Sequence, residues 1–131
     1  MVIVDTTVWV DYLNGRPAPH VGWLERELER QRLGLTDLIL CEVLQGVRDE
    51  HQAAETRREL LKLQVFTTGG VPLAVAAARN YRDLRSRGRT VRRTIDVWIA
   101  TFCLLNDHTL LHNDRDFDAF EEYLRLRVVH P

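Results

Sequence analysis

The chain has 131 residues, the length of one domain that can bury roughly two thirds of the surface of its unfolded chain. Its 45% hydrophobic and 28% charged residues, with only 7 Gly and 4 Pro, exclude a disordered or fibrous protein. The formal net charge of −1 excludes a uniformly basic surface for nucleic acid, so such binding would need a local patch. We therefore expect residues 1–131 to form a single domain.

No segment is apolar enough to cross a membrane, because none approaches the roughly 18 uncharged apolar residues that a span requires. The first apolar run covers residues 1–4 and meets Asp5 at once, so it is too short for the core of a signal peptide. We therefore expect a cytoplasmic protein with no membrane partner. The two cysteines, Cys41 and Cys103, lie inside apolar runs and are expected to be buried, reduced thiols.

The first half of the chain alternates short strands with helices. The opening apolar run is predicted to be a buried strand, and a helix follows it until the stop signal Asn14-Gly15. Apolar residues recur at three and four positions across residues 20–32, which predicts an amphipathic helix. A short strand then ends at Thr36, the expected N-cap of a helix over residues 38–47. That helix is apolar nearly all round, so we expect it to be buried on most sides.

The second half of the chain continues this alternation. The expected elements are a helix over 53–63, a strand over 65–68, helices over 72–87 and 95–106, a strand over 109–112, a helix over 116–124 and a strand over 126–129. Thr94 is the expected N-cap of the helix over 95–106. Short strands that alternate with helices predict a parallel sheet covered on both faces, which is a three-layer α/β/α sandwich.

A few acidic residues stand in segments that otherwise form core. Asp5 ends the first strand, Glu42 stands inside LILCEVL, and Asp96 stands inside TIDVWIATF. Asp114 and Asp116 follow the apolar strand TLLH in the sequence HNDRDF. An isolated ionised carboxylate is costly to bury, so these acids need a compensating partner.

Arginine is one possible partner, and it would give buried ion pairs. For any one of these acids alone, this is the default interpretation. Taken together the acids favour it less, because the apolar segments that carry them, residues 1–13, 38–47 and 95–105, contain no cation.

A divalent metal ion is the other possible partner. The carboxyl ends of parallel strands form one edge of a sheet, and Asp5 and Asp114 both follow predicted strand ends. Asp96 lies in the first turn of its predicted helix, near the positive end of the helix dipole. Carboxylates without His or Cys suit Mg²⁺ or Mn²⁺, and Thr6 and Asn113 could add hydroxyl and amide contacts around them.

Such a site predicts hydrolysis of a phosphodiester, because all-oxygen Mg²⁺ sites typically bind substrate phosphates and activate a water. Six arginines precede Asp96 within twelve positions: Arg82, Arg85, Arg87, Arg89, Arg92 and Arg93. We expect Arg89, Arg92 and Arg93 to hold a phosphate backbone close to the metal. The alternative is that these arginines are a solvated helix end and loop.

Four segments, in this order, resemble the PIN-domain family, and more narrowly the ribonuclease toxins of the VapC type. They are VIVDTTVWVDYL, LTDLILCEVLQGV, TIDVWIATFCLLN and LLHNDRDFDAF, and together they span nearly the full chain. The resemblance implies a five-stranded parallel sheet between helices, with an acidic pocket that holds one or two Mg²⁺ or Mn²⁺ ions. The acids of that pocket are Asp5, Glu42, Asp96 and Asp114. Asp116 is a further candidate ligand, because members differ in which acid of the last motif reaches the metal.

The resemblance also implies an activity and partners. The activity is cleavage of single-stranded or looped RNA by metal-activated water, as the toxin of a type II toxin-antitoxin module. The partners are a neutralising antitoxin, whose C-terminal segment lies in a groove near the first helices, and a second copy of the chain within a larger hetero-oligomer. The candidates to line that groove are Trp9, Tyr12, Leu13 and Trp23, although aromatic residues at helical spacing also serve as core.

The residues of this chain fit other protein classes less well. A phosphoaspartyl transferase needs a second acid two positions after its nucleophile, where Thr7 stands. A receiver domain needs an acid after the third strand and a lysine after a later one, but VFTTGG has no acid and Lys62 is misplaced. The remaining alternative is a catalytically inactive PIN fold that binds RNA or protein. The intact acidic set argues against that alternative.

Overall fold

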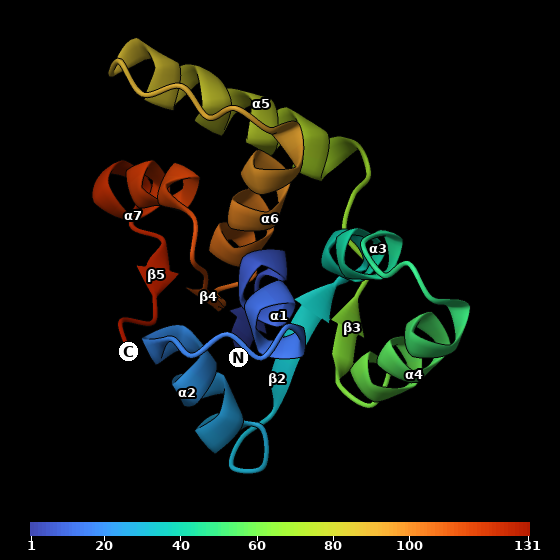
Figure 1. Cartoon of the computed structure of the whole chain (residues 1–131). Coiled ribbons are helices and arrows are strands. Elements are labelled where there is room, and N and C mark those ends of the chain that lie inside the picture. The colour runs from blue at the N-terminus through green and yellow to red at the C-terminus, as the bar shows by residue number, and fades with distance from the viewer.

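Five parallel strands form the sheet at the centre of the protein. The computed structural model describes residues 1–131, and its strands lie in the order β3-β2-β1-β4-β5 (Figure 1). All pairs of neighbouring strands are parallel. The strands are β1 (Val2–Val4), β2 (Leu33–Thr36), β3 (Gln64–Phe66), β4 (Thr109–Leu111) and β5 (Arg127–Val128). The predicted five-stranded parallel sheet is confirmed.

Seven α-helices and one short 3₁₀ helix connect the strands. They are α1 (Thr6–Leu13), α2 (Pro19–Glu27), α3 (Asp37–Gln45), α4 (Glu50–Leu60), α5 (Val71–Ser86), α6 (Thr94–Leu105), the 3₁₀ helix η1 (Arg115–Phe117) and α7 (Asp118–Leu124). Helix α4 begins earlier than residue 53, because the Asp49 side chain accepts a hydrogen bond from the His51 N–H and caps the first turn. None of the helices has both the length and the apolar character that a membrane crossing demands.

The helices form two layers, one on each face of the sheet. The chain steps from β1 through β2 to β3 in one direction, and from β4 to β5 in the other. Because such parallel connections are right-handed, α1 to α4 cover one face and α5 to α7 cover the opposite face. The contacts agree, since α1 packs against α2 and α3, α3 against α4, and α5 against α6 and α7 (Figure 1). This is the predicted three-layer sandwich.

The central strands and α6 supply much of the buried core. Ile3 and Val4 of β1 are fully buried, as are Leu110 and Leu111 of β4. Helix α6 is buried along most of its length, as its nearly continuous apolar sequence predicts. Burial of each large aliphatic side chain contributes about 1.5–3 kcal/mol to stability. This packing fixes the carboxyl ends of β1 and β4, where the chain places Asp5 and His112.

The prediction that the helix after Thr36 is buried on most sides is wrong. Only Ile39 and Val43 of α3 are buried, and Cys41 is exposed rather than buried. The reason is that α3 packs on α1, α4 and the strands β2 and β3, and no other element covers its outer side. Cys103 of α6 is buried, as expected.

Gly34 of β2 offers a test of how tightly the sheet is packed. A Cβ atom at Gly34 would lie 2.9 Å from Met1 Sδ, 3.0 Å from Phe66 Cε2 and 3.1 Å from the Gln64 carbonyl oxygen. We expect Gly34→Ala to lower the free energy of unfolding by about 1–3 kcal/mol, because the added methyl overpacks the core. Urea denaturation measures the change.

The matched control is Gly22→Ala in α2, where the new Cβ would lie 3.4 Å from Arg26 Nη1 and meet nothing else within 4 Å. This change should raise the free energy of unfolding by about 0.4–1 kcal/mol, because alanine has less conformational entropy to lose on folding. Equal effects of the two substitutions would show that Gly34 is not sterically constrained.

Candidate active site

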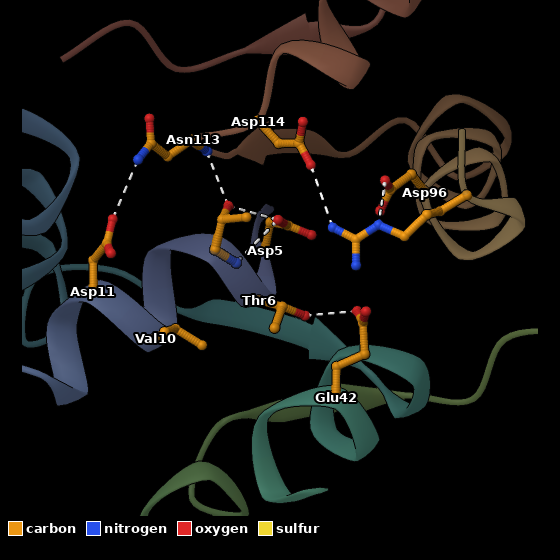
Figure 2. A pocket seen from close by; sticks show the side chains of 10 residues that line it. Asp5, Thr6, Val10, Asp11, Glu42, Asp96, Asn113 and Asp114 are labelled. Carbon is orange, nitrogen blue, oxygen red and sulfur yellow. Dashed lines mark hydrogen bonds and ion pairs between the residues drawn. The ribbon is translucent and has the colours of Figure 1, made fainter. Parts of the chain in front are cut away.

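An acidic pocket of about 280 Å³ lies at the carboxyl ends of β1 and β4 (Figure 2). The chain leaves β1 toward one edge of the sheet and β4 toward the other, so the pocket stands at the point where the strand order reverses. Ligands of open α/β sheets collect at this point. The pocket is lined by Asp5, Thr6, Thr7, Val10, Asp11, Glu42, Arg93, Asp96, Asn113 and Asp114.

Asp5 joins the end of β1 to the start of α1. Its N–H donates to the Leu111 carbonyl at 2.9 Å, which continues the pairing of β1 with β4. Its carboxylate is the N-cap of α1 and accepts hydrogen bonds from the Thr7 N–H at 3.1 Å and the Thr7 hydroxyl at 2.7 Å. Burial raises the pKa of Asp5 to about 6, although the hydrogen bonds from Thr7 oppose this rise.

Asp96 enters the pocket from the first turn of α6 and is 4% exposed. Its Oδ2 atom is buried and accepts no hydrogen bond. Burial raises the pKa of Asp96 to about 7, with a further rise from the negative charge of Asp5, while the charge of Arg93 opposes the rise.

Thr94 is not the N-cap of α6, which corrects the prediction. Thr94 is already the first helical residue, and the extended Arg93 stands at the N-cap position without a side-chain cap hydrogen bond. The chain therefore presents a guanidinium, rather than a capping hydroxyl, at the residue before α6 begins.

Glu42 reaches the pocket from α3. The Thr6 hydroxyl donates to Glu42 Oε1 at 2.7 Å, so the first residue of α1 orients an acid from a different segment (Figure 2). Thr6 thus contacts Glu42, and Thr7 contacts Asp5. Side-chain contacts of this kind fix the direction of a carboxylate that would otherwise rotate freely.

Asp114 and Asp116 lie in the turn after β4. Asp114 caps η1, because its Oδ1 atom accepts the Asp116 N–H at 2.9 Å. Asp96, Asp114 and Asp116 each offer one carboxylate oxygen, and these oxygens all lie within 4.8 Å of one another. Asp116 therefore stands with the other two in one candidate cation site, although it does not line the acidic pocket. Asp5 and Glu42 line the pocket with Asp96 and Asp114 but do not belong to that trio.

Two arginines from outside the apolar segments accompany these acids, so the absence of a cation within those segments does not leave the acids without ion pairs. Arg93 Nε lies 3.6 Å from Asp96 Oδ2, and Arg93 Nη2 lies 3.7 Å from Asp114 Oδ2. Arg92 Nε lies 3.2 Å from Asp116 Oδ2. Both arginines precede the apolar segment of α6 in the sequence; Arg93 contacts the first turn of α6 through Asp96, and Arg92 contacts η1 through Asp116.

Arg89 lies apart from the acidic pocket. Its Nη1 atom donates to Glu122 Oε2 at 2.6 Å, and its guanidinium stands 5.7 Å from the centre of the Tyr123 ring. Of the three arginines predicted to hold phosphate, only Arg93 lines the pocket, and Arg92 reaches its edge through Asp116.

The oxygen donors of this pocket fit a hard divalent cation. A buried carboxylate oxygen without a donor is costly, and Asp96 Oδ2 is such an atom. Arg93 approaches it at 3.6 Å with a side chain that is 60% exposed, which leaves room for a closer cation. Carboxylates alone, with no His or Cys among the lining residues, are the ligands that Mg²⁺ and Mn²⁺ prefer.

Thr7 and Asp11 belong to the pocket but are not singled out by sequence reasoning. They stand four positions apart in α1, so they lie on one face of that helix. The sequence carries no signal that singles out Asp11, because its partner Asn113 stands 102 positions away in the chain. Asn113 Nδ2 donates to Asp11 Oδ2 at 3.2 Å.

A second, more apolar hollow of about 650 Å³ lies between α1, the end of α2 and α4. Three of the four predicted groove residues, Trp9, Tyr12 and Leu13, line it, whereas Trp23 does not. The other lining residues are Leu28, Glu29, Glu55, Thr56, Glu59, Leu60, Lys62 and Leu63.

Residues 2–123 match the family model described as the PIN domain. The chain belongs to the PIN-domain family. Two of its curated relatives carry the VapC name. It is 28% identical to Ribonuclease VapC11 of Mycobacterium tuberculosis over 131 residues, which cover 98% of each chain. It is 31% identical to Ribonuclease VapC19 of the same organism over 123 residues, which cover 93% of this chain and 96% of that relative.

Solved structures of VapC proteins share this PIN fold. VapBC2 from Rickettsia felis, bound to a DNA fragment of its promoter, superposes with a TM-score of 0.77 at 17% identity and 98% coverage of both chains. A toxin-antitoxin complex from Klebsiella pneumoniae superposes with a TM-score of 0.75 at 17% identity, covering 100% of this chain and 98% of the other. The sequence resemblance to PIN domains of the VapC type is thus confirmed.

The raised pKa values of the pocket acids predict how stability depends on pH. In metal-free buffer, Asp5 with a pKa of about 6 and Asp96 with a pKa of about 7 bind protons more tightly in the folded protein than in the unfolded chain, where the ordinary pKa is 3.8. The free energy of unfolding should therefore fall as the pH rises from this ordinary value through the folded-state values. Urea denaturation in EDTA across this range measures it.

Asp96→Asn isolates the contribution of Asp96. It should flatten the pH dependence and raise the free energy of unfolding at about pH 8 by an amount on the order of 1–3 kcal/mol, because it removes a buried charge beside Asp5. Glu25→Gln, at an exposed position of α2, is the control and should leave the profile unchanged. A large loss of stability in Asp96→Asn would instead show that its ion pair with Arg93 holds the fold together.

Proposed function

We propose that residues 1–131 act as one PIN domain with a metal-dependent endoribonuclease activity, as the toxin of a toxin-antitoxin module. The observation that carries this proposal is the acidic pocket. Acids from the end of β1, from α3, from α6 and from the turn after β4 converge at the point where the strand order reverses. The names of the curated relatives, which are ribonucleases, support the reaction class.

Asp96, Asp114 and Asp116 are the residues that would hold a Mg²⁺ or Mn²⁺ ion, with Asp5 facing them across the pocket. When bound, such an ion activates a water and neutralises charge on a phosphate. Thr7 holds the Asp5 carboxylate in place, and Thr6 holds Glu42. Arg92 and Arg93 bring positive charge to the rim, where the phosphates of a strand would pass.

The substrate of this proposal is single-stranded or looped RNA. Sequence-specific RNA recognition mostly targets unpaired loops and bulges, whose bases and backbone can be splayed out. Asp5, Asp96 and Asp114 stand at a strand end, a helix start and a turn at one edge of the sheet, and Glu42 joins them from within α3. We expect a flexible strand to approach this edge more easily than a rigid duplex can. The scissile phosphate would lie between the acids and Arg93.

An antitoxin is the proposed protein partner. The structural neighbour from Klebsiella pneumoniae is a toxin-antitoxin complex, which supports this choice. The second hollow offers an apolar floor for an antitoxin segment, including Tyr12, Leu28 and Leu63. A homodimer within the hetero-oligomer remains a prediction, and the uncovered outer side of α3 and the exposed Val71 and Val75 of α5 are candidate contact surfaces for it.

The alternative of an inactive PIN-fold binding module is less consistent with the site. Such a module gains nothing from an acid that is 4% exposed with an unsatisfied oxygen, as Asp96 is. Apolar or amide side chains at the same positions would remove the repulsion among the pocket acids and stabilise the fold.

Loss of the pocket charge should abolish the reaction. The protein, freed of any co-purified partner, is incubated with total cellular RNA in Mg²⁺ or in EDTA, and new 5′ ends are mapped. Wild type should give discrete cuts in Mg²⁺ alone, and Asp96→Asn should cut about 100-fold less or not at all, because several kcal/mol of transition-state stabilisation are lost. Glu25→Gln is the charge-matched control. Undiminished cleavage by Asp96→Asn would contradict the metal-nuclease proposal.

The rim arginines should contribute to RNA affinity through charge. In an Asp96→Asn background, which binds without cutting, Arg92→Ala with Arg93→Ala should weaken binding of a single-stranded RNA. If both contact phosphates, the slope of log affinity against log salt concentration should fall by about 1.4, since each phosphate contact to a single strand contributes about 0.7. Filter binding across a salt series measures this slope.

The control for this pair is Arg57→Ala with Arg58→Ala, two exposed arginines of α4 that remove the same charge. This double variant should leave the slope unchanged. If both double variants change the salt slope equally, Arg92 and Arg93 are solvated surface residues and not phosphate contacts.

A further inference from the structure

A chain of hydrogen bonds runs from a buried histidine in α2 to the candidate metal site. His20 is 9% exposed, and its Nε2 atom lies 2.8 Å from Asp11 Oδ2 in α1. The same Asp11 oxygen accepts the Asn113 side-chain N–H at 3.2 Å. A histidine and an amide from two separate segments therefore meet on one carboxylate oxygen.

From Asn113 the chain of hydrogen bonds continues to Asp5. The Asn113 backbone N–H donates to Thr7 Oγ1 at 3.0 Å, and the Thr7 hydroxyl donates to Asp5 Oδ2 at 2.7 Å. Asn113 therefore contacts Asp11 through its side chain and Thr7 through its backbone, and Figure 2 shows its side chain directed toward Asp11. Asn113 is also the residue directly before Asp114, so its position determines where the Asp114 backbone begins.

Asp11 lines the pocket, but it is held away from the other acids. Its carboxylate points toward Asn113 rather than toward Asp96 or Glu42 (Figure 2), and its side chain is 14% exposed. The pairing with His20 and Asn113 occupies Asp11 Oδ2 with two hydrogen-bond partners. Asp11 therefore serves better as an anchor for Asn113 than as a ligand.

We propose that His20 and Asp11 are positioning residues, which fix Asn113 and thereby hold the candidate ligand Asp114, and the pocket acid Asp5 beside it, in place for the binding of a divalent cation. This inference rests on the proposed metal-dependent function. Asn113 touches both the α1 side and the β4 side of the pocket, so its fixed position sets the distance between the two. Outer groups that orient ligands in this way commonly change metal affinity about 10- to 100-fold when removed.

Charge alone predicts a different result for the loss of His20. If His20 is neutral, its removal leaves the charge near the pocket unchanged, and if it is protonated, its removal makes the surroundings more negative. Neither change weakens the attraction for a cation. Weaker cation binding without His20 would therefore report lost positioning rather than lost charge.

The test compares His20→Leu, which loses the N–H but fills the space, with His20→Gln, which keeps an N–H near the position of Nε2. Isothermal titration with Mn²⁺ alone measures the affinity, and melting in EDTA and in Mn²⁺ measures the stabilisation by the ion. We expect about 10-fold weaker Mn²⁺ binding in His20→Leu, with a smaller shift in melting temperature, and wild-type affinity within about 3-fold in His20→Gln.

A second variant and a control make the result decisive. Asn113→Ala, at an exposed and uncharged position, removes the other partner of Asp11 and should weaken Mn²⁺ binding to a similar extent, so it decides the matter if His20→Leu does not fold. His51→Leu removes an exposed histidine that lies 3.2 Å from Glu55 Oε1 in α4 and should change nothing.

Two results would overturn the inference, and they are distinguishable. If wild type binds Mn²⁺ and the His20 and Asn113 variants bind it equally well, the hydrogen-bond chain serves only the fold. The same holds if both His20 variants lower the melting temperature in EDTA but leave the shift caused by Mn²⁺ unchanged. If wild type itself does not bind Mn²⁺, the proposed metal-dependent function fails, and the positioning role fails with it.

Discussion

The parallel pairing of β1 with β4 is the constraint on which the site depends. The register places Val4 opposite Leu111, and the Asp5 N–H continues the ladder to the Leu111 carbonyl. Two buried strands therefore end side by side, and the chain leaves them in opposite directions. The chain segments that follow β1 and β4 leave a pocket between them. Glu42 from α3 and Asp96 from the first turn of α6 also line this pocket. Without this pairing, acids that are distant in sequence would not share a pocket.

Bringing these acids together opposes folding, because their negative charges repel one another. The hydrogen bonds that offset this repulsion are not shared equally among the acids. Hydrogen bonds from Thr6 and Thr7 and from the backbone of η1 satisfy Glu42, Asp5 and Asp114. Asp96 receives no such donor on its Oδ2 atom, and only the exposed Arg93 approaches it. The least satisfied acid is thus also a buried one, since Asp96 is 4% exposed. This pattern is typical of a group kept for function rather than for stability.

Much of the fold could be predicted, because its signals are local. Short apolar runs, helical periodicity and the Asn14-Gly15 stop each act within a few residues. Together they predict the succession of strands and helices along the chain. The acids Asp5 and Asp96 were recognisable because a charge inside an apolar segment is unusual. Asp11 was not, since an acid in an amphipathic helix normally faces water, and only the fold brings it to Asn113.

Other errors have the same origin in long-range packing. The sequence of α3 is apolar nearly all round, but the neighbouring elements decide which sides are covered, and Cys41 and Gln45 are left exposed. Thr94 has the chemistry of an N-cap, yet the backbone becomes helical one residue too early for that role. Arg93 is outside the apolar segment of α6 in the sequence. Its approach to Asp96 is local, three positions along the chain, but its approach to Asp114 depends on the turn after β4.

The open side of α3 has a practical consequence for spectroscopy. Cys103 is buried in α6, so Cys41 is the one thiol of the chain that a maleimide or a spin label can reach in the folded state. Cys41 directly precedes Glu42, whose carboxylate is tied to α1 through Thr6. A reporter attached to the native chain, without an engineered cysteine, would thus lie on the helix that carries one wall of the pocket and would sense its movement.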